Sequence, residues 1–281
     1  MSAPRGATPF SDVSLSRRLE RAEGYACAQF AEARKRVFAD CGSEWIECGG
    51  AYSVFDGIDS PITQTFGLGM FEEVTEPALE KIERFFFERG AAVHHEVSPF
   101  VGVEALAMLA RRGYLPSEVS SVMYRPVEPP ATKLPDGIAV RVIDADEARL
   151  WSEINARGWS HDHPEFREFL LNFGAVLTER KNSPCFLAEI DGVPGAAGAL
   201  SIHEGVALFA GAATVPEFRR RGLQAALLSE RMRYAAENGC DLAMMVVLPG
   251  SESQRNGERN GFRIAYTRTK WKLQESVKGN R

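Results

Sequence analysis

The segment from residue 206 to residue 238 joins an apolar strand, a basic turn and an amphipathic helix with no spacer between them. The strand, residues 206–215, ends before Pro216, and the turn then carries three consecutive arginines and Gly222. The first backbone N–H groups of a helix lack internal partners, and the helix dipole favours negative charge at that end. Gly222 also lets the backbone approach a ligand closely. The segment therefore predicts an α/β unit whose turn binds a phosphorylated ligand.

Two other phosphate-binding motifs do not explain this turn. A P-loop needs a Gly-Lys-Ser/Thr run and the dinucleotide fingerprint needs G-x-G-x-x-G, and the sequence contains neither. The net charge of −5 argues against a general nucleic-acid binder, so the arginines form a local cluster.

The cysteine pattern and the lengths of the apolar segments indicate the cellular compartment in which the protein is expected. The five cysteines are odd in number and show no C-x-x-C spacing, which indicates buried thiols in a reducing environment rather than disulfides or a zinc site. Residues 1–13 are polar without an apolar stretch, and no run of about 18 apolar residues occurs. We therefore expect a cytoplasmic protein with no signal peptide, no membrane span and no metal.

A proline-rich segment separates the chain into halves of similar size. Residues 126–137 contain four prolines and no hydrophobic periodicity, which is typical of an interdomain linker. We predict one domain at residues 1–126, a linker at 127–137 and a second domain at 138–281.

The C-terminal half alternates strands and helices. The patterns predict strands at residues 138–143, 185–190, 196–203, 206–215, 242–248 and 262–273, and helices at 146–156, 165–173, 223–238 and 253–260. Asp191-Gly192 is typical of a hairpin turn between two of the strands. The fully apolar run at 242–248 indicates a central strand.

The N-terminal half repeats part of this plan. A helix that ends at Gly90 precedes an apolar strand that ends at Pro99, as a helix that ends at Gly239 precedes a strand that ends at Pro249. Each copy then has a short helix, a glycine followed by an aromatic residue, and a closing strand. We interpret this as a tandem repeat of one domain plan. The alternative is two unrelated α/β halves that share glycines and prolines at the ends of their helices and strands.

These features together resemble the GNAT superfamily of N-acetyltransferases. The turn at residues 219–225 is similar to the family's acyl-CoA pyrophosphate loop, Q/R-x-x-G-x-G/A, although Gln224 stands in the final small position. The element order and the Gly261-Phe262 step also fit, so the resemblance covers residues 137–281. It implies an α/β fold of two tandem GNAT-like domains, each a mixed, mostly antiparallel twisted sheet flanked by helices.

The resemblance implies acetyl-CoA as co-substrate and assigns residues to it. The backbone of one strand end would pair with the pantetheine arm, the turn would hold the pyrophosphate, and two helix residues would lie where the pantetheine passes. In order, these residues are Ala213, Thr214, Val215, Arg219, Arg220, Arg221, Gly222, Leu223, Gln224, Ala225, Ser253 and Asn256. Helix capping alone would also explain Ser253.

The corresponding turn of the N-terminal half has a different charge. Residues 65–76 contain three glutamates and no arginine, and carboxylates repel a pyrophosphate. We therefore expect only the C-terminal half to bind acyl-CoA, and the degenerate N-terminal half to shape the substrate cleft or a homodimer.

The resemblance implies direct attack of an amine on the thioester in a ternary complex, but the acid and base are not evident. Gly257 stands where many family members have a tyrosine acid. Tyr266 is one substitute, although a strand aromatic in the core is the favoured explanation of this residue. His163 and Glu165 are candidates for the base or for amine binding, and a polar loop with helix caps is the alternative.

Three functions fit the sequence. The first is an acyl-CoA-dependent N-acetyltransferase that acts on a primary amine of a small molecule. The second is a non-catalytic acyl-CoA-binding or sensing protein, which the missing tyrosine favours. The third is a protein N-acetyltransferase. For each of them we expect neither nucleic acid nor membrane as a partner.

Overall fold

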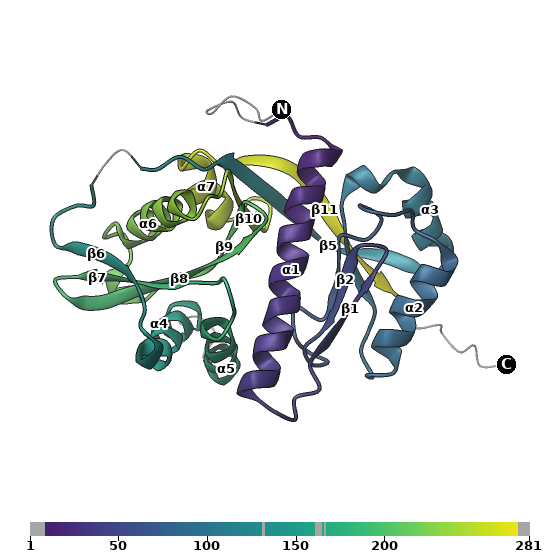
Figure 1. The fold of residues 1–281 in the computed structure, drawn as a ribbon, viewed down its shortest axis with the longest axis horizontal. Coiled ribbons are helices and arrows are strands. Elements are labelled where there is room, and N and C mark those ends of the chain that lie inside the picture. Colours follow the sequence, from purple (N-terminus) through teal and green to yellow (C-terminus); the bar gives the residue numbers. More distant parts are fainter. Residues whose placement is uncertain (1–8, 131–132, 161–164, 166, 275–281) are drawn as a thin grey trace. The chain divides into compact units, whose positions relative to one another are not determined.

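The computed structural model describes residues 9–130, 133–160, 165 and 167–274 (Figure 1). These residues form two compact units, and each unit combines separate segments of the chain. Unit 1 takes Pro9, Glu32–Ala39 and Tyr124–Met245, and unit 2 takes Phe10–Ala31, Asp40–Met123 and residues 246–274.

Unit 1 is built on a mixed sheet. Its strands follow one another in the order β10 (Leu242–Val247), β9 (Val206–Thr214), β8 (Val193–His203), β7 (Cys185–Ile190) and β6 (Ile138–Val142). Strands β6 to β9 are antiparallel neighbours, whereas β10 runs parallel to β9.

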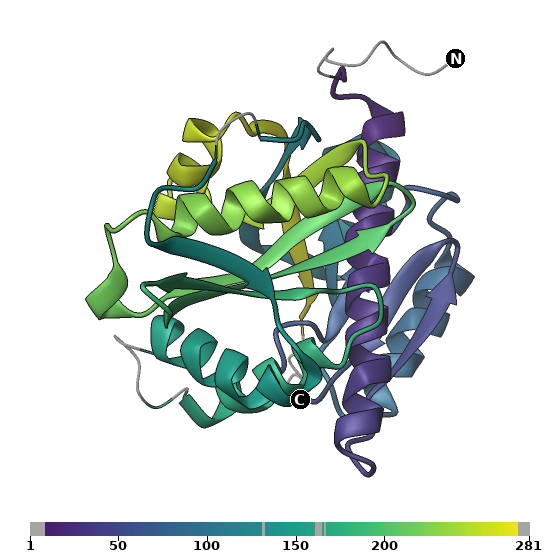
Figure 2. The ribbon, with the colours of Figure 1, turned by 60° about the vertical axis from the view of Figure 1, so that its left-hand side comes forward.

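Helices cover both faces of this sheet. Helix α6 (Leu223–Glu237) lies on one face, and α4 (Ala148–Trp159) and α5 (Arg167–Thr178) lie on the other (Figure 2). Trp151 of α4 is fully buried, and its indole N–H donates to the carbonyl oxygen of Phe186 at 3.0 Å. This bond satisfies the polar atom of a large core side chain and fixes α4 on the sheet.

Unit 2 holds a second set of paired strands, with both parallel and antiparallel neighbours. Its strands follow the order β1 (Glu44–Cys48), β2 (Ala51–Phe55), β3 (Gln64–Phe66), β4 (His94–Val97), β11 (Arg263–Leu273) and β5 (Tyr114–Pro126). The first three strands are antiparallel, β3 and β4 are parallel, and β4 and β11 are antiparallel.

The helices of unit 2 are α1 (Val13–Val37), whose residues from Glu32 onward belong to unit 1, and α2 (Glu76–Phe87), α3 (Val103–Arg111) and α7 (Glu252–Arg259). Helix α1 packs on a cluster that includes Tyr52 and Phe66, and Gly24 allows a close approach, because a Cβ there would lie 2.6 Å from the Tyr52 ring. Helices α2 and α3 pack around a second cluster centred on Leu79, Phe86 and Leu109.

The predicted element order is confirmed, but the last strand lies elsewhere than expected. Strand β11, predicted to close the C-terminal half, pairs with β4 of unit 2 from Thr269↔Val97 to Lys272↔His94. It lies between β4 and β5, whereas the repeat leads one to expect the N-terminal half's own closing strand beside β4. The compact units thus differ from a division of the chain at 127–137, and those domain boundaries stay a prediction.

The fold class is as predicted: mixed sheets flanked by helices occur in both units. Within the part of the chain described above, no helix is long and apolar enough to cross a membrane.

Candidate functional site

Strands β9 and β10 pair over a short stretch only. Their parallel register runs from Val206↔Leu242 to Leu208↔Met244 and ends there. The remainder of β9 continues to Thr214, and the basic turn follows at its carboxyl end. In open α/β sheets, ligands bind beyond the carboxyl ends of strands. The carboxyl end of β9 and the turn after it therefore form a candidate ligand site.

The turn after β9 has a backbone shape suited to anions. A short 3-10 helix, Pro216–Phe218, is followed by Arg220 and Gly222, whose φ angles are 60° and 88°. Among the described residues, no hydrogen bond uses the backbone N–H groups of residues 220–225 as donors, and Gly222 caps α6 without a side chain. Unpaired N–H groups at a helix start, next to left-handed residues, form an anion-binding concavity.

The three arginines of the turn are not equivalent. Arg219 donates from Nε to the Thr214 carbonyl oxygen at 3.4 Å and from Nη2 to the Gly158 carbonyl oxygen at 3.2 Å. Arg221 lies over the Phe218 ring, with Cζ 5.2 Å from the centroid. Arg219 thus ties the turn to β9 and to the end of α4, while Arg220 and Arg221 are exposed beside the open N–H groups.

Gln224, the departure from the family pattern, folds back onto β9. Its side-chain Nε2 donates to Thr214 Oγ1 at 2.7 Å. The extra side chain therefore contacts the strand end and leaves the backbone N–H of Gln224 available. Ala213, Thr214, Val215 and Leu223 are buried, and Ala225 is exposed on the first turn of α6.

Two residues predicted to contact pantetheine lie in unit 2. Ser253 and Asn256 belong to α7, and the N-cap of that helix is Ser251, whose Oγ accepts a hydrogen bond from the backbone N–H of Gln254 at 3.2 Å. Ser251 and not Ser253 therefore caps α7, so the capping explanation of Ser253 is wrong. The side chain of Asn260 donates to the backbone oxygen of Asn256 at 2.7 Å.

Tyr266, the predicted substitute acid, also lies in unit 2 and is buried. Its hydroxyl donates to Glu20 Oε1 at 2.8 Å. Burial, and then the nearby charge of Glu20, raise the pKa of Tyr266 well above its ordinary value. A hydroxyl held in this way is a poor proton donor to a thiolate, so the structure favours the core aromatic interpretation. Glu165 is exposed, and His163 lies outside the described residues.

Unit 2 buries a charged cluster around Arg268. Its guanidinium contacts Glu23 at 2.5 Å, Glu96 at 3.0 Å and Glu20 at 3.4 Å. Lys270 adds a second cation 3.7 Å from Glu96. Burial raises the pKa of Glu20 to about 7, although the charge of Arg268 opposes that shift. The neighbouring carboxylates of Glu23 and Glu96 raise this pKa further.

The turn after β3 in unit 2 differs from the turn after β9. Gly67, Leu68 and Met70 are buried. Arg17 of α1 donates from Nε to the Met70 carbonyl oxygen at 2.5 Å, and Ser16 Oγ lies 3.0 Å from Ser98 Oγ. Side chains of α1 therefore occupy the region that corresponds to the open end of β9.

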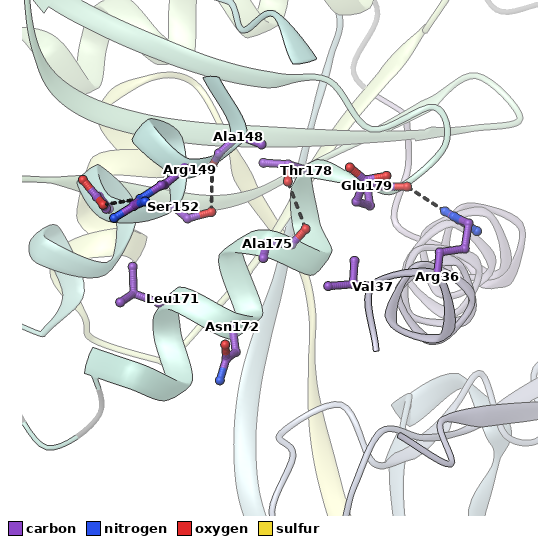
Figure 3. A pocket seen from close by; sticks show the side chains of 11 residues that line it. Arg36, Val37, Ala148, Arg149, Ser152, Leu171, Asn172, Ala175, Thr178 and Glu179 are labelled. Atoms are coloured by element: carbon purple, nitrogen blue, oxygen red, sulfur yellow. Dashed lines mark hydrogen bonds and ion pairs between the residues drawn. The ribbon is translucent and has the colours of Figure 1, made fainter. Parts of the chain in front are cut away.

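A pocket of about 640 Å³ also lies in unit 1, between α4, α5 and the end of α1 (Figure 3). Several of its polar side chains already have partners. Arg36 donates to the Glu179 carbonyl oxygen at 2.6 Å, and Arg149 pairs with Glu153 at 3.1 Å. The apolar part of its wall comes from small side chains such as Ala148 and Ala175. These internal partners leave few side-chain groups to orient a ligand in this pocket.

Two buried polar residues that contact β9 were not predicted from the sequence. Asn155 of α4 donates to the Gly211 carbonyl oxygen, and Arg231 of α6 donates to the carbonyl oxygens of Ala199 and Ala210. A signal was present for one of them. Arg231 follows Leu227 at i, i+4 spacing on the apolar face of α6, where an arginine is unusual.

Comparison with known proteins supports one family. Residues 147–262 match the family model described as acetyltransferase (GNAT) family. A GCN5-related N-acetyltransferase from Kribbella flavida is 20% identical with a TM-score of 0.62, over 89% of this chain and 96% of that one. A GCN5-related N-acetyltransferase from Sphaerobacter thermophilus is 18% identical with a TM-score of 0.52, over 91% and 93%.

A tandem GNAT protein from the clavulanic acid biosynthesis pathway is also similar in structure. It is 12% identical with a TM-score of 0.54, over 96% of this chain and 98% of that one. The curated protein sequences give no significant match. Residues 147–262 thus match the GNAT acetyltransferase family model, and the chain as a whole is similar in fold to GNAT proteins, one of them a tandem GNAT protein.

Proposed function

We propose that this protein is an acyl-CoA-dependent N-acetyltransferase that uses acetyl-CoA and acetylates a primary amine of a small molecule. The observation that carries the proposal is the turn after β9. Its backbone N–H groups at residues 220–225 have no acceptor among the described residues, and two exposed arginines, Arg220 and Arg221, stand beside them. A pyrophosphate supplies the negative oxygens that such donors and charges bind.

The proposal gives each part of unit 1 a role. The turn at residues 219–225 holds the pyrophosphate, with Arg219 bracing the turn rather than contacting the ligand. The pantetheine arm runs beside Ala213, Thr214 and Val215, where β9 has no register with β10. Ser253 and Asn256 stay candidates for the pantetheine on the family resemblance alone.

Catalysis in this proposal rests on positioning. An amine held beside the thioester attacks the carbonyl carbon directly, and the thiolate of CoA leaves. Holding both reactants in a ternary complex can account for a large part of the rate. The general acid and base stay unassigned, because Tyr266 is bonded to Glu20 and Gly257 has no side chain.

We propose one acyl-CoA site for each chain. In unit 2 the donors at the start of α2 are capped by Thr75, whose Oγ1 accepts from Ala78 N at 3.3 Å, and Pro77 contributes no N–H. Glu76 at this helix start is paired with Arg112. These contacts support a degenerate N-terminal half that binds no acyl-CoA.

Steady-state release of CoA thiol from acetyl-CoA, measured with a panel of small primary amines and amino-acid-like acceptors, tests the proposal. We expect amine-dependent turnover well above hydrolysis of acetyl-CoA by the protein alone. Mass spectrometry of the acceptor should show a gain of one acetyl group.

The second candidate function is a non-catalytic acyl-CoA-binding protein. Gly257 at the usual tyrosine position and the engaged hydroxyl of Tyr266 favour it. Binding of CoA in calorimetry with no turnover on any amine would support this function over the first. Turnover on peptide amines but not on small amines would instead support a protein N-acetyltransferase.

A further inference from the structure

Strand β9 contains a β-bulge close to its carboxyl end. The register pairs Ala210 with Ala199 and Ala213 with Ala197, so two residues of β9 stand opposite the single residue Gly198. Gly211, the first of those two, has a φ angle of 60°. A glycine with positive φ supplies the left-handed turn that such a bulge requires. The bulge redirects the backbone of β9 just before residues 213–215.

Two side chains hold this bulge from opposite faces of the sheet. Asn155 of α4 donates from Nδ2 to the Gly211 carbonyl oxygen at 2.6 Å. Arg231 of α6 donates from Nη1 to the Ala210 carbonyl oxygen at 3.4 Å and to the Ala199 carbonyl oxygen at 3.1 Å. Helices α4 and α6 cover opposite faces (Figure 2). We call Asn155 and Arg231 the bulge clamp.

Burial of the two polar side chains of the bulge clamp has an unfavourable desolvation free energy. Asn155 and Arg231 are each 3% exposed, and burial alone lowers the pKa of Arg231 to about 10. The sheet makes room for the guanidinium at Gly198, where a Cβ would lie 3.2 Å from Cζ of Arg231. An apolar side chain of similar volume is often at least as stabilising as a buried charge. The arginine therefore contributes something that packing alone would not require.

The clamped carbonyls belong to peptide units that come directly before residues 213–215, the strand end that the proposed function assigns to the pantetheine arm. The peptide unit with the Ala210 carbonyl also carries the N–H of Gly211, and the unit with the Gly211 carbonyl carries the N–H of Ala212. A hydrogen bond accepted by a carbonyl polarises its peptide unit and strengthens the N–H as a donor. The clamp thus fixes the orientation of two consecutive peptide units of β9 and polarises them.

This inference rests on the proposed function. With the pyrophosphate on the turn at 219–225 and the pantetheine arm running back along residues 215 to 213, the thioester end of the ligand reaches the bulge. We propose that Asn155 and Arg231 are positioning residues, which hold the bulge and thereby fix the backbone of residues 211–215 beside the acyl end of the ligand. Neither residue contacts the reacting atoms; both act through the backbone of β9.

Hydrogen exchange of the full chain without ligand tests the clamp directly. We compare the wild type with Asn155→Leu, Arg231→Met and the control Ser152→Ala, a buried residue of α4 whose Oγ bonds only its own helix, at the Ala148 carbonyl oxygen. Amides of residues 210–213 should exchange about tenfold faster in the two clamp variants and at the wild-type rate in the control. Unchanged exchange at the bulge would overturn the inference.

Kinetics then separate positioning from ligand binding. The clamp variants should lower kcat about 10- to 100-fold, because a misplaced thioester loses alignment, while affinity for CoA, which lacks the acyl group, changes less than twofold. Asn155→Asp keeps the shape of the side chain but donates only when protonated. Its kcat relative to wild type should therefore rise as the pH falls from 8 to 5.

The outcomes distinguish the two proposals. If the wild type binds no acyl-CoA, the proposed function fails and the positioning role fails with it, whatever hydrogen exchange shows at the bulge. If the wild type binds and turns over acetyl-CoA while the clamp variants keep the wild-type kcat, the positioning role alone is overturned. A kcat ratio for Asn155→Asp that does not change with pH would also count against the clamp.

Discussion

Units 1 and 2 each contain a strand–turn–helix segment, with the turn after β9 in unit 1 and the turn after β3 in unit 2. The two segments differ in how the backbone N–H groups at the helix start are capped. Helix α6 begins after Gly222, which offers no capping side chain. Helix α2 begins after Thr75, which caps the helix, and Pro77 removes one donor from its first turn. Among the described residues, one helix start leaves its backbone donors unpaired, and the other has one donor capped by a side chain and one replaced by proline.

The surroundings of the two turns differ in the same sense. Residues 219–222 are exposed, whereas Gly67, Leu68 and Met70 are buried. In unit 2, Arg17 of α1 bonds the Met70 carbonyl oxygen. The two turns therefore differ in the space around them and in their backbone donors as well as in charge.

The largest expected effect comes from reversing the charge of the open turn. Arg220→Glu together with Arg221→Glu should weaken CoA binding by about 100-fold or more, since two charge-assisted contacts are lost and two repulsive charges are added. Isothermal titration calorimetry with CoA measures this. Arg233→Glu, on α6 but paired with Glu230 at its surface, is the matched control and should bind as the wild type does. Unchanged affinity in the double variant would remove the turn from the proposed site.

Much of the fold could be predicted from local patterns. Glycines such as Gly90, Gly113 and Gly239 follow helix ends, and each has a positive φ that other residues rarely adopt. The apolar run at 242–248 correctly indicated a strand, β10, whose first three residues are buried. The position of β11 could not be predicted, because its buried Arg268 finds its carboxylate partners on α1 and β4, about 170 to 250 residues earlier in the chain.

The candidate site was predictable in its backbone and less so in its side chains. Gly222 and the strand before it gave the open turn, because helix starts and glycines have regular geometry. Sequence alone did not show that Arg219 bonds two carbonyl oxygens or that Gln224 bonds Thr214. These contacts depend on which way a side chain turns, and no spacing rule encodes that direction.

A moderate effect is expected from the buried cluster that anchors β11 in unit 2. The folded-state pKa of Glu20 is raised to about 7, from a reference value of 4.5. The folded protein therefore retains a proton that the unfolded chain releases between these values, so this contribution to stability is full below pH 4.5 and is lost as the pH rises through 7. Glu20→Gln removes this dependence and leaves Arg268 paired with Glu23 and Glu96.

Thermal unfolding measured from pH 5 to 8 checks this expectation. The loss of Tm over that range should be smaller in Glu20→Gln than in the wild type, by roughly 3–6 °C. The control is Glu47→Gln, which removes an exposed carboxylate paired with Arg21 of the same unit and should keep the wild-type slope. Parallel curves for Glu20→Gln and the wild type would mean that Glu20 does not hold the extra proton.

The smallest expected effect tests whether charge or space accounts for the proposed lack of CoA binding at the turn after β3 in unit 2. Glu72→Arg together with Glu73→Arg makes the turn of unit 2 basic, and both side chains are exposed. We expect calorimetry still to give one CoA for each chain, because Thr75 keeps its cap on α2 and Arg17 keeps its bond to Met70. A second bound CoA in this variant would show that charge alone separates the two turns. Stoichiometry unchanged here, but raised to two when Arg17→Ala and Thr75→Gly are added, would assign the difference to the closed helix start and to the α1 side chain that fills the turn.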